Sequence, residues 1–345
     1  MNDVYDKCYA KICTVAKSEN AMKILYVGYR DDNHSKYGGY DHIAQYPESD
    51  FLDAKNVPFG FIPSGRRGKR INLFFLDIIS RVKRYKYDIV HLIYGDSQLL
   101  SAHGKNIKHK IVITMHLKIQ DMTPKKIEYL KKMDGVIVLS SEQYFYAKKI
   151  GFNAYFVPHG FDKPTYNSLL PICKNNRTLD FSKINVFFSG TMYRNYDILY
   201  HFVNLIKNRN DIVIHVLGQK NNEKARLVDY NNVIIWERLS DDQYYSLLSM
   251  CDYNLLPLLF STANNALMEA QNLGIRTIIS DIEGVRDYAC CDGNLFFKDK
   301  YDLEKIVFIL KKEFQSDTII KHAQKYYWKN IYMQLQKLYI DLFKD

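Results

Sequence analysis

The chain has 345 residues, of which 47% are hydrophobic and 25% charged, and its formal net charge at pH 7 is +10. This length favours two domains, and the apolar content is enough for two packed cores, which argues against an intrinsically disordered chain. The positive charge suits an anionic partner such as a nucleotide, a phospholipid surface or a nucleic acid, without distinguishing among them.

Cysteine usage and hydropathy constrain the compartment. None of the six cysteines forms a Cys-x-x-Cys pair, and no cluster of His and Cys has the spacing of a zinc site. No apolar run approaches the roughly 18 residues of a membrane span, and the N-terminus has no apolar signal core. We therefore expect no metal site and a cytoplasmic protein, which could lie peripherally at the inner face of the membrane. The cysteines are Cys8, Cys13, Cys173, Cys251, Cys290 and Cys291.

The first half of the chain alternates short apolar runs with amphipathic segments. Residues 1–21 form an N-terminal extension ahead of the first run. Continuous apolar strands that alternate with helices predict a parallel, doubly wound α/β sheet, so we expect a Rossmann-like domain over residues 22–165. The expected strands are residues 23–27, 88–93, 110–114, 135–139 and 154–157.

A polar stretch at residues 166–182, with Pro171 and the run Lys174-Asn-Asn-Arg177, predicts a linker. The alternation then resumes, which predicts a second Rossmann-like domain over residues 183–320. Residues 321–345 have a helical pattern, and this helix could cross back to the N-terminal domain. The expected strands of the second domain are residues 184–188, 212–217, 232–236, 253–256 and 276–279.

Two such domains would present the carboxyl ends of their strands to a cleft between them. The residues that follow the expected strands are therefore candidates for a site. They include Gly28, Asp96, His116, His159, Gly190, Arg194, Gly218, Arg238 and Leu239.

The most informative stretch is a polar loop that leads into an expected helix over residues 264–273. Asn264 or Asn265 is a suitable N-cap, and Gly274 is a natural stop. The unpaired N–H groups of a helix N-terminus bind phosphate readily, and Glu269 lies one turn further on the same face as Asn265. A diphosphate at the helix start would thus place ribose hydroxyls near Glu269. The alternative is an N-capped surface helix with an exposed Glu.

Over roughly residues 22–340 the chain resembles glycosyltransferase family 4 and its relatives with the GT-B fold. The resemblance is carried by four pieces in the expected order. These are Gly38-Gly39 after the first strand, Val157-Pro-His-Gly-Phe-Asp162, the strand–loop–helix–strand segment 232–257, and Asn265-Ala-Leu-Met-Glu-Ala270 followed by 274–281. It implies an α/β GT-B fold, with two Rossmann-like domains facing each other across a cleft, and a UDP- or GDP-linked nucleotide sugar as donor substrate, with no cofactor.

The resemblance also implies residue roles. Glu269 matches the glutamate that binds the donor's ribose, and the loop Ser189–Arg194 resembles the one that places a cation against the diphosphate. His116 falls where the family has a histidine facing the donor sugar, so the expected catalytic residues are His116, Arg194 and Glu269. The expected donor-binding residues are Gly38, Gly39, Gly190, Gly218, Arg238, Leu239, Thr262, Asn264, Asn265, Ala266, Leu267 and Glu269.

One departure stands out. The family's donor helix carries a second glutamate eight residues before the ribose-binding one, and here that position is Ser261. The family's contact to the sugar ring is therefore in doubt, and Thr262 or Asn264 could supply it instead. Asp41 and Asp96, on loops of the N-terminal domain, are candidates for binding an acceptor hydroxyl.

The densest basic segment is residues 66–86, with Arg66-Arg67-Gly68-Lys69-Arg70 at its start. It predicts either a solvated loop and helix face or a patch that docks on an anionic membrane, where each basic residue contributes about 1 kcal/mol. The second reading favours a lipid-linked acceptor.

We therefore expect a retaining, metal-independent glycosyltransferase that acts on a glycan or lipid-linked acceptor in surface polysaccharide or glycoconjugate biosynthesis. Two alternatives share the fold. They are a sugar-nucleotide 2-epimerase and a non-catalytic sugar-nucleotide-binding subunit, the latter favoured by Ser261. A nucleic-acid binder is supported by positive charge alone, because no recognition motif is present, and we expect no nucleic-acid partner.

Overall fold

The structure is a computed structural model that describes residues 22–30, 37–56, 66–97, 109–167, 179–218, 223, 225–313 and 315–344. The chain packs into two units. Unit 1 consists of residues 1–34, 39–160 and 328–345, and unit 2 of residues 35–38 and 161–327. The expected extension 1–21 and most of the expected linker 166–182 lie outside the described residues.

Unit 1 is built around a six-stranded sheet whose neighbouring strands all pair in parallel. The two-domain α/β fold predicted from the sequence is thus confirmed, although the edge strand β2 was not predicted. The strand order is β2 (Ser49–Asp53), β1 (Ile24–Gly28), β3 (Ile89–Leu92), β4 (Lys110–Met115), β5 (Gly135–Val138) and β6 (Ala154–Phe156).

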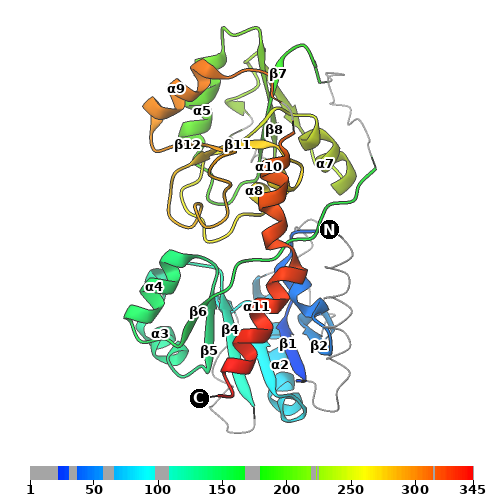
Figure 1. The fold of residues 1–345 in the computed structure, drawn as a ribbon, viewed down its shortest axis with the longest axis vertical. Coiled ribbons are helices and arrows are strands. Elements are labelled where there is room, and N and C mark those ends of the chain that lie inside the picture. Colours follow the sequence, from blue (N-terminus) through cyan, green and yellow to red (C-terminus); the bar gives the residue numbers. More distant parts are fainter. Residues whose placement is uncertain are drawn as a thin grey trace. The chain divides into compact units, whose positions relative to one another are not determined.

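Helices cover both faces of this sheet (Figure 1). Side chains on alternate strand positions form a core with α2 (Arg66–Lys83), α3 (Pro124–Leu130) and α4 (Ser141–Lys149). The opposite face meets α11 (Trp328–Asp341), whose buried Tyr339 hydroxyl lies 3.1 Å from that of Tyr26 and 2.7 Å from Nδ1 of His91. The C-terminal helix therefore belongs to unit 1, whereas residues 317–327 remain in unit 2.

Unit 2 has a second six-stranded parallel sheet. Its order is β12 (Leu295–Phe297), β11 (Arg276–Ser280), β10 (Tyr253–Leu256), β7 (Ile184–Ser189), β8 (Ile212–Leu217) and β9 (Val233–Trp236). One face packs against α5 (Tyr196–Ile206) and α9 (Lys300–Ile309). The other face packs against α7 (Asp241–Ser249) and α8 (Asn265–Asn272), with α10 (Asp317–Ala323) beside α8. The order places a topological switch between β7 and β10, where ligands bind in open α/β sheets.

The same device joins neighbouring strands at their amino ends in both units. A carboxylate just before one strand accepts the N–H of a residue at the start of the next. Asp252 does so for Asn185 (2.7 Å), Asp88 for Lys23 (2.7 Å) and Asp134 for Ile111 (2.8 Å). These bonds satisfy backbone N–H groups at the amino-terminal ends of the strands and help to fix the register between neighbouring strands.

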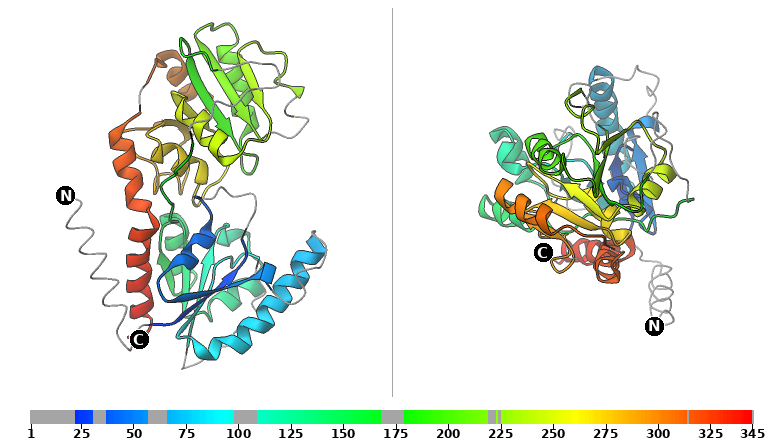
Figure 2. Two further views of the ribbon diagram at one scale, coloured as in Figure 1. Left: turned by 90° about the vertical axis from the view of Figure 1, so that its right-hand side faces the viewer. Right: turned by 90° about the horizontal axis from the view of Figure 1, so that it is seen from above.

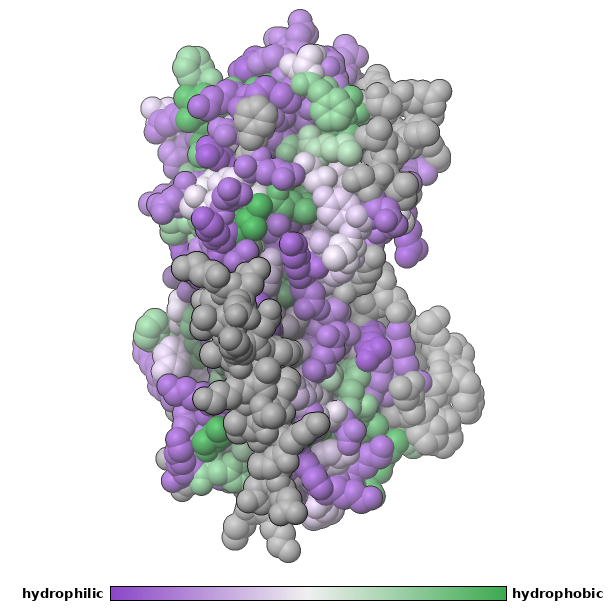
Figure 3. Space-filling view, turned by 45° about the vertical axis from the view of Figure 1, so that its right-hand side comes forward, coloured by the Kyte–Doolittle hydropathy of each residue, from purple (hydrophilic) through white to green (hydrophobic). Residues whose placement is uncertain are grey.

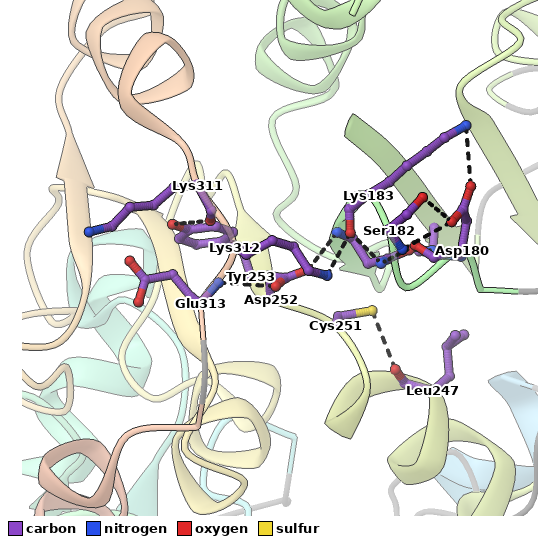
Figure 4. A network of polar contacts seen from close by, with 12 residues as sticks. Asp180, Ser182, Lys183, Leu247, Cys251, Asp252, Tyr253, Lys311, Lys312 and Glu313 are labelled. Atoms are coloured by element: carbon purple, nitrogen blue, oxygen red, sulfur yellow. Dashed lines mark hydrogen bonds and ion pairs between the residues drawn. The ribbon is translucent and has the colours of Figure 1, made fainter. Parts of the chain in front are cut away.

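Asp252 is the most elaborate case (Figure 4). Its side chain, 4% exposed, also accepts from Nζ of Lys312 (3.0 Å) and from the N–H of Glu313 (3.1 Å). Lys312 in turn donates to the carbonyl of Lys183 (2.6 Å), which stands just before β7. This network joins β7, β10 and the segment after α9 at the amino-terminal ends of the strands, opposite the strand ends that carry the candidate site.

Candidate functional site

The loops that follow β7 and β10 meet at the switch point of unit 2. Arg194 and Leu258 form an antiparallel bridge, and the N–H of Leu259 donates to the carbonyl of Tyr193 (2.9 Å). The N–H of Asn195 donates to the carbonyl of Pro257 (2.9 Å), and the Asn195 side chain then caps α5. The β7 loop is therefore pinned by its own helix and by the neighbouring loop.

Two glycines make room for this arrangement. Gly190 and Gly218 end β7 and β8 with φ values of +89° and +88°, a conformation that favours glycine. A Cβ on Gly190 would also lie 2.7 Å from Nη2 of Arg194. Both predicted glycines thus allow the backbone conformation at the strand ends beside Arg194.

Arg194 lies over the end of β7. Its Nε donates to the carbonyl of Ser189 (2.9 Å) and its Nη1 to the carbonyl of Met192 (3.2 Å). Burial lowers the pKa of Arg194, and the nearby Tyr244, Tyr196 and Glu269 partly offset this effect. A guanidinium cannot deprotonate near neutral pH, so the result is a fixed cation that has lost part of its hydration and gains from an anionic ligand.

Helix α8 begins as predicted at an asparagine cap. Oδ1 of Asn264 accepts the N–H of Leu267 (3.2 Å), so that donor is already used within the helix. The N–H groups of Asn265 and Ala266, in the first turn, have no carbonyl partner within α8. Of the backbone donors predicted from the sequence, the N–H of Leu267 is therefore already used by the cap.

Gly38 approaches the same helix end within unit 2. A Cβ at Gly38 would come within 3.2 Å of both Nδ2 of Asn265 and the Phe161 ring. The N–H of Asp162 donates to the carbonyl of Tyr37 (3.1 Å), which holds this short segment in place. The glycine pattern therefore marks a close approach of the backbone to the start of α8.

Glu269 is 6% exposed and lies one turn into α8. Its Oε2 accepts from the hydroxyl of Tyr244 (2.6 Å) and its Oε1 from that of Tyr245 (3.3 Å). The Tyr244 hydroxyl also lies 3.3 Å from Oγ of Ser189. Since the Ser189 carbonyl holds Arg194, Tyr244 connects the predicted cation loop to the predicted ribose carboxylate.

These two tyrosines were not among the residues predicted from the sequence. They stand on α7, which starts with a capping box between Ser240 and Gln243. The adjacent tyrosines were visible as part of the segment 232–257, but nothing in a helical period shows that both hydroxyls reach one carboxylate on another helix.

Ser261 and Thr262 lie in the loop before α8, 5% and 6% exposed. Within the described part of the chain, Oγ of Ser261 is buried without a hydrogen-bond partner. A buried hydroxyl in this state costs free energy that a ligand could recover. The position where the family resemblance leads one to expect a glutamate is thus occupied by an unsatisfied neutral group.

Arg238 and Leu239, which could contact the nucleobase of the donor, lie at the end of β9. Arg238 is exposed, and Leu239 packs against the core on the α7 side. The preceding Trp236 donates its indole N–H to Nδ1 of His215 (3.1 Å), whose Nε2 lies 2.9 Å from Oδ1 of Asn185. This buried chain fixes the strand end from which Arg238 and Leu239 project.

In unit 1, His116 stands at the end of β4. Its Nε2 lies 2.8 Å from the carbonyl of Ile93, and because a carbonyl only accepts, Nε2 carries the proton. The carboxylate of Asp96 accepts the backbone N–H groups of His116 (2.7 Å) and Leu117 (3.0 Å). His116 and Asp96 therefore come together, with the carboxylate holding the histidine's loop.

The remaining predicted residues of unit 1 are also near one another. A Cβ on Gly39 would lie 2.3 Å from Oδ1 of Asp41, so the carboxylate would have to move to admit any larger residue. Asp41 lies 3.7 Å from Nε of Arg30, which is 3.9 Å from Asp53. His159 contacts the Tyr40 ring, with centroids 5.0 Å apart, and its Nδ1 lies 2.5 Å from the carbonyl of Gly160.

The described residues contain no group of three or more His, Cys, Asp or Glu side chains that could hold a metal ion. Across the same residues, no helix combines the length and apolarity needed to span a bilayer.

Comparison with known proteins bears on both units. Residues 183–307 match the model of the family described as Glycosyl transferases group 1, and this range runs from β7 to α9 and includes Arg194 and Glu269. The search of curated proteins gives no match.

Solved structures share the fold of the whole chain. Sucrose-phosphate synthase from Thermosynechococcus elongatus superposes with a TM-score of 0.66 at 15% identity, covering 100% of this chain and 94% of that one. Anabaena HepE in complex with UDP gives 0.65 at 13%, covering 92% and 99%. The catalytic domain of starch synthase IV from Arabidopsis thaliana, bound to ADP and acarbose, gives 0.67 at 9%, covering 94% and 100%. This chain therefore has the GT-B fold predicted from its sequence.

Proposed function

We propose that this chain, whose second unit belongs to the glycosyl transferases group 1, moves a sugar from a nucleotide-sugar donor to a glycan or lipid-linked acceptor. One observation carries the proposal. Tyr244 links the Arg194 loop to Glu269, so the parts that would hold diphosphate and ribose meet at the switch point of unit 2. The complexes of HepE with UDP and of starch synthase IV with ADP support a nucleoside diphosphate in this place.

Each part of the site has a role in binding the donor. The N–H groups of Asn265 and Ala266 and the guanidinium of Arg194 receive the diphosphate, whose charge they stabilise without a metal ion. Glu269 accepts hydrogen bonds from ribose hydroxyls, because a carboxylate oxygen has a second lone pair beside the one that a tyrosine uses. The base lies against the end of β9, near Arg238 and Leu239.

In the reaction, the bond between the anomeric carbon and the diphosphate oxygen breaks, and the acceptor oxygen bonds to that carbon. Arg194 and the α8 N-terminus stabilise the charge that develops on the departing diphosphate. The acceptor's proton passes to this phosphate, so no separate base is needed, and the new bond keeps the donor's anomeric configuration. By the family resemblance, His116 takes part in the reaction, and Asp41 and Asp96 bind the acceptor.

We propose further that the acceptor belongs to surface polysaccharide or glycoconjugate assembly, at the cytoplasmic face of a membrane. The basic segment 66–86 supports this role, because it would bring the enzyme to anionic lipid.

A thermal-shift panel of nucleoside diphosphates and sugar nucleotides tests the donor site, because a specific ligand stabilises the fold by mass action. We expect the nucleotides of one nucleobase to raise the melting temperature of the wild type. Glu269→Ala should abolish most of this rise. Glu304→Ala, on α9 at the opposite face of the sheet, is the matched control and should keep the shift. No shift with any nucleotide would refute the proposal.

A non-catalytic subunit is the second candidate, favoured by Ser261. A donor-hydrolysis assay distinguishes the two. A scaffold would bind the nucleotide sugar but would hydrolyse none of it, whether as the wild type or as the Glu269→Ala variant. A 2-epimerase would convert the donor without enlarging a glycan, whereas a glycosyltransferase releases free nucleotide together with an enlarged glycan.

A further inference from the structure

Helix α2 of unit 1 has apolar side chains on two faces. Leu73 and Leu76 are 6% and 1% exposed and pack into the core of unit 1. By contrast, Phe74 is 50% exposed, Ile78 40% and Val82 72%. The helix therefore carries more apolar surface than the sheet covers.

The exposed residues form one stripe. Phe74, Ile78 and Val82 follow one another at intervals of four residues, which places them on one side of an α-helix. Tyr85, 66% exposed, continues the line in the short helix after α2. At 100° per residue the stripe lies on the side of the helix opposite to Leu76. Figure 2 shows α2 on the outer side of unit 1, across the sheet from α11.

Other exposed apolar side chains on the described surface form smaller groups, such as Met192, Tyr193 and Leu259 in the loops after β7 and β10, and Tyr301 and Phe308 on α9. On the face shown in Figure 3, hydrophilic side chains prevail and apolar ones form small separate groups. Isolated exposed apolar residues are ordinary, but a continuous stripe along a helix marks a surface that something covers.

Basic residues flank the stripe. Arg81, Lys83 and Lys86 are exposed at the C-terminal end of α2 and just beyond it. The single acidic residue of α2, Asp77, is 8% exposed and lies 3.8 Å from Arg81. The exposed side of α2 is thus apolar and cationic.

This chemistry selects among the possible occupants. A second copy of the chain would bring like charges together across the stripe, which is unfavourable. A nucleic acid offers phosphate but nothing for the apolar side chains to enter. An anionic bilayer surface satisfies both features, since the apolar side chains enter the acyl boundary while the basic ones meet lipid phosphates. The charges along α2 also mean that it would lie on the bilayer rather than cross it.

We infer that α2 is an interfacial helix, which docks unit 1 on an anionic lipid surface by inserting the stripe Phe74, Ile78, Val82 and Tyr85. The docking rests on the proposed function in one respect, the delivery of a lipid-linked acceptor. Binding to lipid needs neither donor nor acceptor, so its failure and the failure of glycosyl transfer are separable.

Vesicle co-sedimentation of the full chain tests this inference. We expect binding to vesicles of phosphatidylcholine mixed with phosphatidylglycerol, whose negative surface potential attracts basic segments, and little binding to phosphatidylcholine alone. The double variant Phe74→Ser with Val82→Ser should weaken binding at least about tenfold, since two inserted side chains are lost. Arg81→Gln with Lys83→Gln should weaken it less and flatten its dependence on salt.

Two measurements guard against misfolding. Phe145→Ser, on α4 of the same unit, removes a ring that is 69% exposed, more than Phe74, and should leave binding unchanged. Phe74→Trp should keep binding and show a blue-shifted emission on adding anionic vesicles. The two native tryptophans, Trp236 and Trp328, are 1% and 2% exposed and give a constant background.

Three results would overturn the inference. They are no binding of the wild type to anionic vesicles, equal binding of the double Ser variant, and a concentration-dependent dimer that this variant abolishes. The last result would assign the stripe to a second copy of the chain.

Discussion

The two units place different chemistry at the same point of a shared scaffold. In unit 2 the strand order reverses between β7 and β10, and the loops there carry glycines, an arginine and a helix N-terminus. In unit 1 the order reverses between β1 and β3, and aromatic rings gather around His116. Tyr94 and Tyr40 lie 4.9 Å and 4.7 Å from it between centroids, and Tyr29 stacks on Tyr94 at 4.4 Å. The scaffold fixes where a ligand can sit, and the loops decide which ligand it is.

The difference suggests a division of labour. A charged ligand such as a diphosphate needs donors and a cation, which the loops of unit 2 offer. In unit 1 the cation after β1, Arg30, lies 3.7 Å from Asp41 and 3.9 Å from Asp53, so carboxylates already stand beside it. The rings beside His116 are buried instead, with Tyr40 2% and Tyr94 8% exposed, so they pack the loops of unit 1 and fix the place of the histidine. Variants in the two units should therefore separate donor binding from acceptor turnover.

The largest effect is expected for Arg194→Ala. Loss of one preorganised donor to a developing charge lowers turnover by about 100- to 1,000-fold. Nucleotide binding, measured by calorimetry, should weaken as well, because the guanidinium holds the same phosphates before the reaction. Arg286→Ala is the control, since Arg286 is paired with Asp281 at 2.8 Å and should have little effect.

His116→Gln completes this test from the other unit. It should lower turnover while leaving the dissociation constant of the nucleotide unchanged. Equal weakening of nucleotide binding by His116→Gln and Arg194→Ala would break the division between the units.

A second comparison concerns the carboxylates at the amino ends of the strands. Asp252→Ala should lower the free energy of unfolding by about 3 kcal/mol, because it leaves the buried N–H of Asn185 unpaired and removes the partner of Lys312. Asp88→Ala, which removes a more exposed cap on Lys23, should cost about 1 kcal/mol. Urea denaturation measures both, and equal losses would show that burial does not set the cost.

Much of this architecture could be predicted from the sequence, for a physical reason. Strands buried on both faces appear as continuous apolar runs, so ten of the twelve strands shown by the structure were found. The two that were missed, β2 (Ser49–Asp53) and β12 (Leu295–Phe297), lie at sheet edges, where fewer positions are buried. The Asn264 cap was predictable because it depends on neighbouring residues alone.

The inner contacts of the site were not predictable. Tyr244 reaches Glu269 across 25 residues, and the pairing depends on how α7 packs on α8. The apolar stripe of α2 was also hidden, since the sequence shows apolar residues on the helix but not which of them the sheet buries. The basic residues drew attention to the segment, whereas its exposed Phe74 and Val82 became evident only from burial.

Acid sensitivity offers a further comparison, because each sheet buries a histidine. Burial lowers the pKa of His91 to about 3 and that of His215 to about 4. Both folded pKa values lie below the unfolded value of about 6.5. The unfolded chain therefore binds more protons below pH 6.5, and stability falls as the pH drops from there towards 4.

Between pH 7 and pH 5, His215 alone should cost about 2 kcal/mol. His215→Gln should flatten the pH dependence of unfolding, measured with urea, whereas His201→Gln, at a partly exposed position, should leave it steep. His91→Gln tests unit 1 in the same way. An unchanged slope in His215→Gln would show that its burial is not what makes unit 2 sensitive to acid.

The smallest effect, and the sharpest test of the donor site, is expected for Tyr244→Phe. Burial and the neighbouring Glu269 raise the pKa of Tyr244, so its hydroxyl stays protonated and donates to the carboxylate. Removing this donor leaves Glu269 less firmly oriented and should weaken nucleotide binding about fivefold, or about 1 kcal/mol. Tyr245→Phe removes the longer bond, 3.3 Å, and should have a smaller effect.

Deoxynucleotides show whether the tyrosine acts through Glu269. Glu269 is expected to accept a hydrogen bond from either the 2′- or the 3′-hydroxyl of the ribose. If Tyr244 positions the carboxylate for this bond, then Tyr244→Phe should not weaken the binding of the deoxynucleoside diphosphate that lacks that hydroxyl. The effect should persist for the other deoxy analogue, which forms a double-mutant cycle between protein and ligand. Equal weakening for both analogues would mean that Tyr244 serves the packing of α7 on α8, and that unit 2, like unit 1, uses its aromatic residues to build the fold.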